Sequence, residues 1–141
     1  MTAAPGRAHR HAPPPPAAAV HELSAAFAAR DLAAALDCFV SDDDIGYVGS
    51  EHGEAATGRA AVASLFGMVF ARDEAYSWQA TAVSVREHGD VAYVLAEADG
   101  LAHGDDGSLT PFPYRVSGLL QRVGDRWRWR HCHGCEPAPE A

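Results

Sequence analysis

The C-terminal stretch 125–136 constrains the fold of this chain more than any other part of the sequence. Read with a period of two, it places Trp127, Trp129, His131, His133 and Cys135 on one face and Arg126, Arg128, Arg130 and Cys132 on the other. Such alternation predicts a β-strand. Its aromatic face must be buried, whereas the arginines stay in water or pair with acids. Buried imidazoles need a hydrogen-bonding partner or a functional role, so we expect this strand to form one wall of a pocket.

Three more long strands are predicted upstream, at 75–87, 91–103 and 112–123, and short polar turns join all four into an antiparallel sheet. The strand at 91–103 alternates strictly. One of its faces holds Val91, Tyr93, Leu95, Glu97, Asp99, Leu101 and His103, and the other holds Ala92, Val94, Ala96 and Ala98. The acids Glu97 and Asp99 either face solvent or pair with the arginines of the last strand, and we expect the pairing.

Helical periodicity precedes these strands. Residues 20–40 carry apolar side chains at three- to five-residue spacing, and Asp31 is expected to cap a second, shorter helix. A short strand is expected at 45–49. Residues 59–72 show the i, i+3, i+4, i+7, i+8 spacing of a helix that packs one face against a sheet. Helices followed by hairpin-linked strands indicate an α+β fold.

Composition and charge exclude several classes of partner. The 141 residues suffice for one domain, and the formal net charge is −8, so the acidic surface repels phosphate backbones and we predict no nucleic-acid partner. No run approaches the roughly 20 apolar residues of a membrane helix, so no membrane partner is expected. Cys38, Cys132 and Cys135 do not make a disulfide framework, which favours a cytoplasmic location.

The chain divides into one domain and two tails. Residues 1–19 are rich in proline and alanine and are predicted to form a disordered tail, because they cannot bury enough apolar surface to offset their ordering entropy. Residues 20–137 form the predicted domain. Residues 138–141 form a short C-terminal tail.

No metal or cofactor is predicted. The run 131–135 contains two histidines and two cysteines, but in a strand Cys132 points away from His131, His133 and Cys135. A structural zinc site also needs a second pair of ligands at typical spacing, which the sequence lacks. The glycine motifs of nucleotide-binding loops and of dinucleotide-binding folds are absent, as is the serine-hydrolase elbow.

The order of elements resembles the SnoaL-like branch of the superfamily of nuclear transport factor 2 and ketosteroid isomerase. The matching stretches are 27–32, 47–50, Glu54 with Gly58 and Arg59, 89–93, and the last strand as far as Pro137. The resemblance covers residues 21–137. It implies a cone-shaped fold, in which a curved, mostly antiparallel sheet wraps around an apolar cavity and the long helix closes one end. It also implies a homodimer.

The resemblance further implies which residues line the cavity. They are Tyr47, Phe66, Phe70, Trp78, Tyr93, His103, His133 and Glu136, with Trp129 also holding the substrate. Tyr47 and Tyr93, tuned by His103, are the expected hydrogen-bond donors to an epoxide or carbonyl oxygen, and Glu136 is the expected base. The aromatic residues and His133 would hold the apolar part of the substrate.

Three functions remain open at this point. The first is a cofactor-independent cyclase of secondary metabolism, which opens an epoxide within an aromatic, prenylated or polyketide-like molecule to close a pyran-type ring. The second is an isomerase of the ketosteroid isomerase type or a SnoaL-type aldol cyclase, with His133 or an acid as base. The third is a small-molecule-binding protein without catalysis, whose pocket needs shape but no perturbed acid or base.

Overall fold

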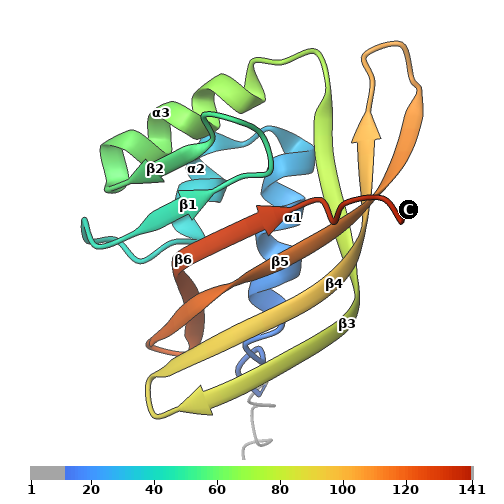
Figure 1. Ribbon diagram of the computed structural model, residues 1–141. Helices are drawn as coiled ribbons and strands as arrows, with labels where there is room; N and C mark the ends of the chain where they lie inside the picture. Colours follow the sequence, from blue (N-terminus) through green and yellow to red (C-terminus); the bar gives the residue numbers. More distant parts are fainter. Residues whose placement is uncertain (1–11, 141) are drawn as a thin grey trace, which may run out of the picture.

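The computed structural model describes residues 12–140 and has the predicted α+β architecture (Figure 1). Residues 1–11 of the predicted tail lie outside the described residues. The helices are α1 (Ala18–Ala29), α2 (Leu32–Asp37) and α3 (Arg59–Phe70). The strands are β1 (Gly46–Val48), β2 (Ala55–Thr57), β3 (Ala75–His88), β4 (Val91–His103), β5 (Leu109–Val123) and β6 (Arg126–Cys135).

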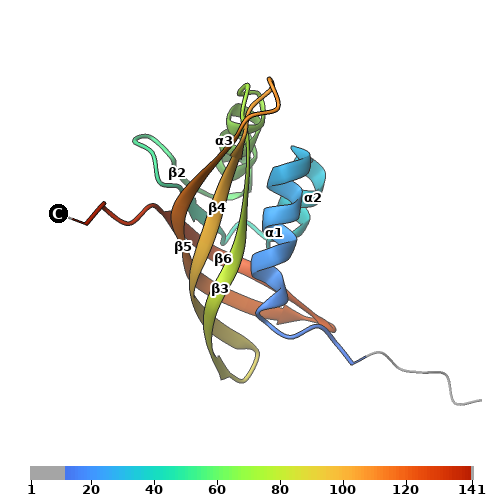
Figure 2. The same cartoon turned by 90° about the vertical axis from the view of Figure 1, so that its right-hand side faces the viewer.

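The strands described by the structure form one curved sheet in the order β2-β1-β6-β5-β4-β3. All neighbouring strands are antiparallel except β1 and β6, which run parallel. Helices α1 and α2 lie together on one side of the long strands, and α3 lies with β1 and β2 at one end of the sheet (Figures 1 and 2). The sheet therefore wraps around α1, as the predicted cone-shaped fold requires.

The helices begin and end where local chemistry dictates. The side chain of Asp31 accepts a hydrogen bond from the Ala34 amide at 3.0 Å and so caps α2, as predicted. Arg30 adopts a left-handed conformation that ends α1. Helix α3 buries Val62, Leu65, Phe66 and Val69, the stripe expected from its spacing.

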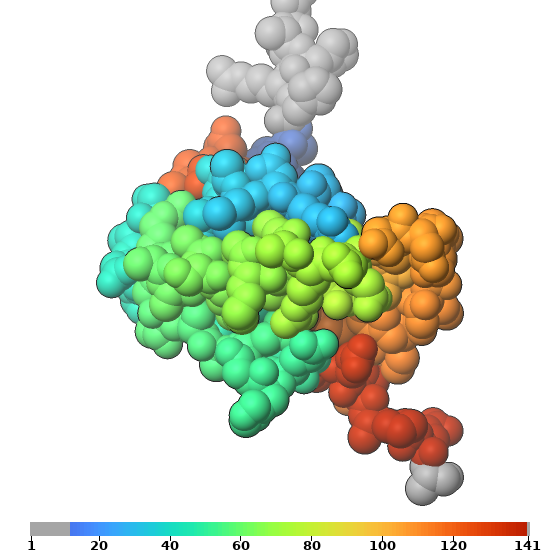
Figure 3. Space-filling model, turned by 90° about the horizontal axis from the view of Figure 1, so that it is seen from above, coloured from blue at the N-terminus to red at the C-terminus, as the bar shows by residue number. Residues whose placement is uncertain are grey.

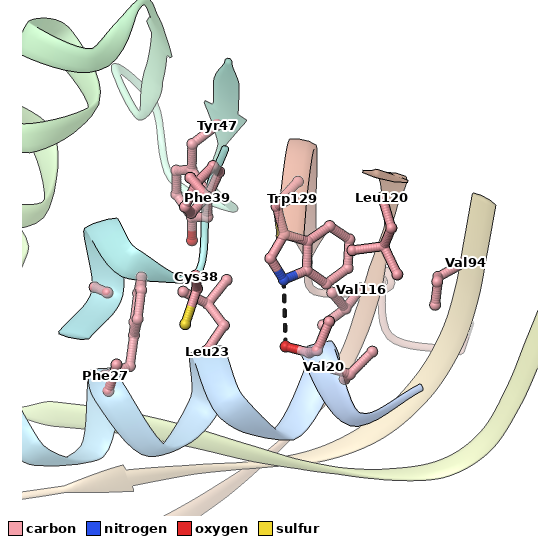
Figure 4. Close-up of a cluster of buried hydrophobic side chains, with 14 of the residues drawn as sticks. Val20, Leu23, Phe27, Cys38, Phe39, Tyr47, Val94, Val116, Leu120 and Trp129 are labelled. Carbon is pink, nitrogen blue, oxygen red and sulfur yellow. Dashed lines mark hydrogen bonds between the residues drawn. The ribbon is translucent and has the colours of Figure 1, made fainter. Parts of the chain in front are cut away.

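The indole groups of two tryptophans hold helix α1 against the sheet. Trp129 is fully buried and donates a hydrogen bond from Nε1 to the Ala19 carbonyl at 3.2 Å (Figure 4). Trp78 donates from Nε1 to the Val20 carbonyl at 3.1 Å. The hydroxyl of Ser24 on α1 is 2.7 Å from the Trp78 carbonyl. These contacts hold the helix in one position against the inner face of the sheet.

A β-bulge in β6 turns the C-terminal half of the strand over, so the face predicted there to be inner is the outer one. Leu119 pairs with His131 and Leu120 pairs with Trp129, so Arg130 is an additional residue without a direct partner. One additional residue reverses the direction of every later side chain. Trp127 and Trp129 face inward as predicted, but beyond the bulge Cys132 and Gly134 are the inner, buried residues. His131, His133 and Cys135 consequently lie on the outer face.

The arginines of β6 pair with acids, although not with the expected ones. Arg126 pairs with Glu22 and Asp37, Arg128 with Asp37, and Arg130 with Asp42. Glu97 pairs instead with Arg115 on the neighbouring strand, at 2.9 Å. The expected pairing of Glu97 with the arginines of β6 is therefore wrong, because α1, α2 and the loop after α2 bring nearer acids.

Candidate functional site

A cavity of about 260 Å³ lies where α1 and the C-terminal end of α3 meet the inner face of β3, β4 and β5. Its walls are mainly aromatic, and they comprise Phe27, Tyr47, Tyr76, Trp78, Phe112 and Tyr114. Its charged lining residues are Glu51, Glu54, Arg72, Glu74 and Glu136. The segment after β1, the end of α3, the β4–β5 hairpin and the C-terminal segment come together at this end of the molecule (Figure 3). The cavity thus joins residues from six different parts of the chain.

Two strand glycines make room for the aromatic walls. Gly100 pairs directly with Phe112, and its missing side chain leaves the space that the Phe112 ring occupies. Gly134 does the same for the phenol of Tyr114. A Cβ atom at either position would collide with the ring or the hydroxyl. Glycine in a strand commonly marks such a close approach.

Tyr47 and Tyr114 place two phenol groups in the cavity wall. Both residues are buried, with 3% and 7% of their surface exposed. Burial raises the pKa of Tyr47 well above its usual value, and the neighbouring Tyr114 raises it further. Burial also raises the pKa of Tyr114. Both phenols therefore remain protonated near neutral pH and are neutral hydrogen-bond donors.

Glu54 is the buried acid of the cavity, with 8% of its surface exposed. The Gly49 amide donates to the Glu54 carbonyl at 2.6 Å, and the side chain of Glu54 lies against Gly49. Burial raises the pKa of the Glu54 carboxyl, the charge of Glu51 raises it too, and Arg72 opposes the shift. Arg72 Nη1 is 3.2 Å from Glu51 Oε2 but 3.9 Å from Glu54 Oε1. Burial thus outweighs the attraction of Arg72, and a carboxylate with a raised pKa is a good proton acceptor.

The carboxyl of Glu54 interacts electrostatically with the phenols of Tyr47 and Tyr114. The charge of Glu54 contributes to the raised pKa of both Tyr47 and Tyr114. Tyr47, Tyr114 and Glu54 also line the same cavity, as acid–base catalysis on one bound molecule requires.

Comparison with known proteins identifies the family. A family model described as a SnoaL-like domain matches residues 17–139. This chain belongs to the SnoaL-like domain family. No curated protein matches the chain.

Solved structures with the same fold differ widely in described role. A proposed dehydratase of the NTF2-like family from Streptomyces avermitilis aligns over 87% of this chain and 94% of its own, with 19% identity and a TM-score of 0.75. A ketosteroid isomerase-like protein from Erwinia carotovora atroseptica aligns over 87% and 94%, with 25% identity and a TM-score of 0.65. A proposed calcium/calmodulin-dependent protein kinase type II association domain from Thiobacillus denitrificans aligns over 92% and 100%, with 25% identity and a TM-score of 0.71. The SnoaL-like fold alone therefore does not select a function.

Three of the predicted site residues lie at the cavity of this SnoaL-like domain. Tyr47 and Trp78 are buried in its wall, and Glu136 lies exposed among its lining residues after β6. Phe66 and Trp129 are fully buried and belong to the core rather than to the lining. Phe66 packs edge-on against Tyr47 with ring centroids 4.9 Å apart, so it supports the wall from behind. Phe70 is half-buried and packs against Phe27 and Phe66.

Tyr93, His103 and His133 lie on the outer face of the sheet, which corrects their expected place in the cavity. Tyr93 is 43% exposed, and His103 Nε2 lies 2.8 Å from Ser77 Oγ. The alternation predicted for β4 is present, but its alanine face points inward because small side chains let α1 approach closely. His133 is directed outward by the bulge at Arg130.

The cavity also contains residues that sequence reasoning did not select. They are Tyr76, Phe112, Tyr114, Glu54 and Arg72. Gly100 and Gly134 in predicted strands were a usable signal for the rings that lie over them. Glu54 matched the SnoaL-like family together with Gly58 and Arg59, but its local sequence resembles an ordinary turn and gave it no role in a site.

Neither a membrane-crossing helix nor a metal cluster is found in residues 12–140. No helix there combines the length and the apolar character needed to cross a bilayer. No group of three or more histidine, cysteine or acidic side chains among the same residues is placed to hold a metal ion.

Proposed function

We propose that this chain is a cofactor-independent enzyme that rearranges a small molecule by acid–base catalysis. The observation that carries the proposal is the convergence of Glu54 with Tyr47 and Tyr114 in one aromatic cavity. All three groups have pKa values raised by burial. Groups perturbed in this way concentrate at catalytic sites, whereas a simple binding pocket has no need of them.

Each group has a separate role in the proposed mechanism. The phenols donate hydrogen bonds to a substrate oxygen on which negative charge develops, and they add no charge of their own. Glu54 takes a proton from the substrate. Trp78 and Phe112 hold the apolar body of the molecule and exclude water, which would otherwise compete as a nucleophile.

Within this class, the reaction we propose is intramolecular opening of an epoxide to form a pyran-type ring. The substrate hydroxyl attacks an epoxide carbon, so that a new C–O bond forms while the epoxide C–O bond breaks. Glu54 accepts the hydroxyl proton, and one of the phenols gives a proton to the released oxygen. Solvent then returns a proton to the phenol and removes one from Glu54, so the sum is an isomerisation. Glu136, the base expected from the sequence, lies exposed at the cavity and is less suited than buried Glu54.

The second candidate is proton transfer next to a carbonyl group, as in an isomerase or an aldol cyclase. The 25% identity to a ketosteroid isomerase-like protein favours it. The same phenols would stabilise the enolate oxygen, and Glu54 would remove the proton from carbon.

Single hydroxyl deletions test the role of the phenols. Purified protein is offered a hydroxyaryl prenyl epoxide and, separately, a β,γ-unsaturated ketone, and the product that forms identifies the reaction. Tyr47→Phe and Tyr114→Phe should each lower kcat by about 10- to 1000-fold, because each removes a donor to the developing charge. Tyr93→Phe is the matched control, since its phenol lies on the outer face, and it should keep the wild-type rate.

Two results would count against this proposal. If the two cavity variants turn over as fast as Tyr93→Phe, the phenols are only core residues. If wild-type protein binds these compounds but converts neither, the site belongs to a binding protein.

The expected homodimer is a further part of the proposal. Tyr93, Leu95 and Leu119 are exposed by 43%, 56% and 37%, and they lie on neighbouring strands of the outer face. Burial of these apolar side chains against a second copy would stabilise a pair of chains. Sedimentation equilibrium should give a mass of twice the 14.9 kDa chain, and a single-chain mass would exclude this pairing.

A further inference from the structure

The charges around the cavity are strongly unbalanced. Among residues 12–140, four carboxylates line it, from Glu51, Glu54, Glu74 and Glu136, against the single guanidinium of Arg72. The same part of the chain contributes no histidine to the lining, and the sequence contains no lysine. Low-dielectric walls concentrate such a field within a cavity. The interior is therefore an unfavourable place for a carboxylate or phosphate group.

Arg72 is not free to bind an anionic substrate. Its Nη1 is 3.2 Å from Glu51 Oε2 and 3.9 Å from Glu54 Oε1, so its charge is already engaged by two acids. Four other arginines of the described residues pair with acids away from the cavity. Arg126, Arg128 and Arg130 pair with acids of α1, α2 and the loop after α2, and Arg115 pairs with Glu97 on the outer face.

Aromatic rings form the other half of the cavity wall. Phe27 and Trp78 meet edge-on with ring centroids 5.1 Å apart, and Trp78 and Tyr114 are tilted at 5.4 Å. Phe112 meets Tyr114 edge-on at 5.6 Å. In an edge-on pair, the ring that contributes its edge has neither of its faces covered by its partner. The electron-rich face of an aromatic ring attracts a cation, and most strongly where water is excluded.

We infer that this cavity selects molecules in which a positively charged amine or quaternary ammonium group adjoins an apolar body, and that it rejects carboxylates and phosphates. The inference rests on the proposed function, because it takes this cavity as the place where the substrate binds. The cation lies against the aromatic rings with Glu54 and Glu51 beside it. The lining carboxylates offset the charge of the ligand inside the cavity.

Three probes of equal shape or size test the charge preference without any reaction. Benzyltrimethylammonium is the cation, neopentylbenzene is its neutral isostere with carbon in place of nitrogen, and phenylacetate is the anion. Calorimetry and the fluorescence of Trp78, which lines the cavity, report binding. The cation should bind on the order of tenfold more tightly than its isostere, and phenylacetate should bind most weakly. Equal or tighter binding of the neutral probe would overturn the inference.

Substitutions of cavity residues test whether the preference for the cation arises inside the cavity. Glu51→Gln combined with Glu54→Gln should reduce the advantage of the cation to about twofold, because it removes two of the lining carboxylates and leaves the shape of the side chains unchanged. Glu97→Gln is the matched control, since Glu97 lies on the outer face paired with Arg115, and it should leave the preference intact. Thermal melts verify that each variant is folded. A cation preference that survives the double change would place the probe elsewhere and refute the inference.

Measurements of probe binding test this inference, whereas measurements of substrate turnover test the proposed enzymatic function. If the cation preference is present but no substrate is converted, the inference stands and only the enzymatic proposal fails. If neutral substrates are converted and the preference is absent, the enzyme stands and the inference fails.

Discussion

Replacing Glu54 with glutamine should lower kcat/KM by about 10²- to 10⁴-fold, because the amide keeps the shape of the side chain but cannot accept a proton. The substrate that the wild-type protein converts is used for the measurement. Glu97→Gln makes the same chemical change on the outer face and should leave kcat/KM unchanged. If Glu54→Gln retains wild-type activity, another group is the base, and the exposed Glu136 becomes the residue to replace next.

The pH dependence of the reaction follows from the same carboxyl. A base works only when deprotonated, and burial raises the pKa of Glu54 above the ordinary glutamate value of 4.5. The activity of the wild-type protein should therefore fall on the acid side, with a midpoint above 4.5. The residual activity of Glu54→Gln should lack this acid limb. A midpoint at or below the ordinary value would contradict the role of Glu54.

As the pH rises, the contribution of Glu54 to stability should fall while the activity of the protein rises. Because the folded state raises the pKa of Glu54, it favours the protonated carboxyl. The stability that Glu54 contributes is thus present at low pH and is lost as the pH rises through the raised pKa. At neutral pH, Glu54→Gln should be at least as stable as the wild-type protein. Such a loss of activity without loss of stability would show that Glu54 is kept for chemistry rather than for folding.

The replacement of Trp129 with alanine should lower the free energy of unfolding by about 3–5 kcal/mol. The side chain is fully buried between α1 and the sheet, so the change leaves a large cavity. It also removes the hydrogen bond from Nε1 to the Ala19 carbonyl. Denaturation by urea, fitted to a two-state transition, measures the difference.

Two further variants separate the contributions of the hydrogen bond and of apolar burial to this loss of stability. Trp129→Phe keeps most of the apolar contact but loses the hydrogen bond, so it should cost less than Trp129→Ala. Met68→Ala removes a side chain that is 56% exposed on α3, and it should lower the free energy of unfolding by no more than about 1 kcal/mol. Equal losses for Trp129→Ala and Met68→Ala would mean that Trp129 does not hold α1 in place.

The core and the candidate site depend on each other through Trp78. Its indole donates to the Val20 carbonyl on α1, while its ring contributes to the cavity wall. Phe66 likewise supports Tyr47 from the core side. A site built on strands and held by packed rings is positioned more rigidly than one built on loops. The donors of the proposed reaction are therefore held in place before the substrate binds.

Local chemistry in the sequence was sufficient to predict the elements and their order. The apolar stripe of α3 and the cap at Asp31 both depend only on neighbours within a few residues. The same holds for the alternation of β4, which the structure confirms residue by residue. The predicted site residues Tyr47 and Trp78 lie in the wall of the candidate cavity. The α+β fold follows from such local signals together with the resemblance to the SnoaL-like family.

Tertiary structure alone decided which side of each strand faces the cavity. An alternating pattern distinguishes two faces but does not say which one is inner, and in β4 the close approach of α1 selected the alanines. The bulge at Arg130 turned His133 outward, because one residue more or less reverses every later side chain. Glu54, Arg72 and Tyr114 are 18 to 60 residues apart in the sequence and meet only when the sheet curls. Their pKa values and their proposed chemistry arise from burial and from each other's charges, which no local sequence pattern encodes.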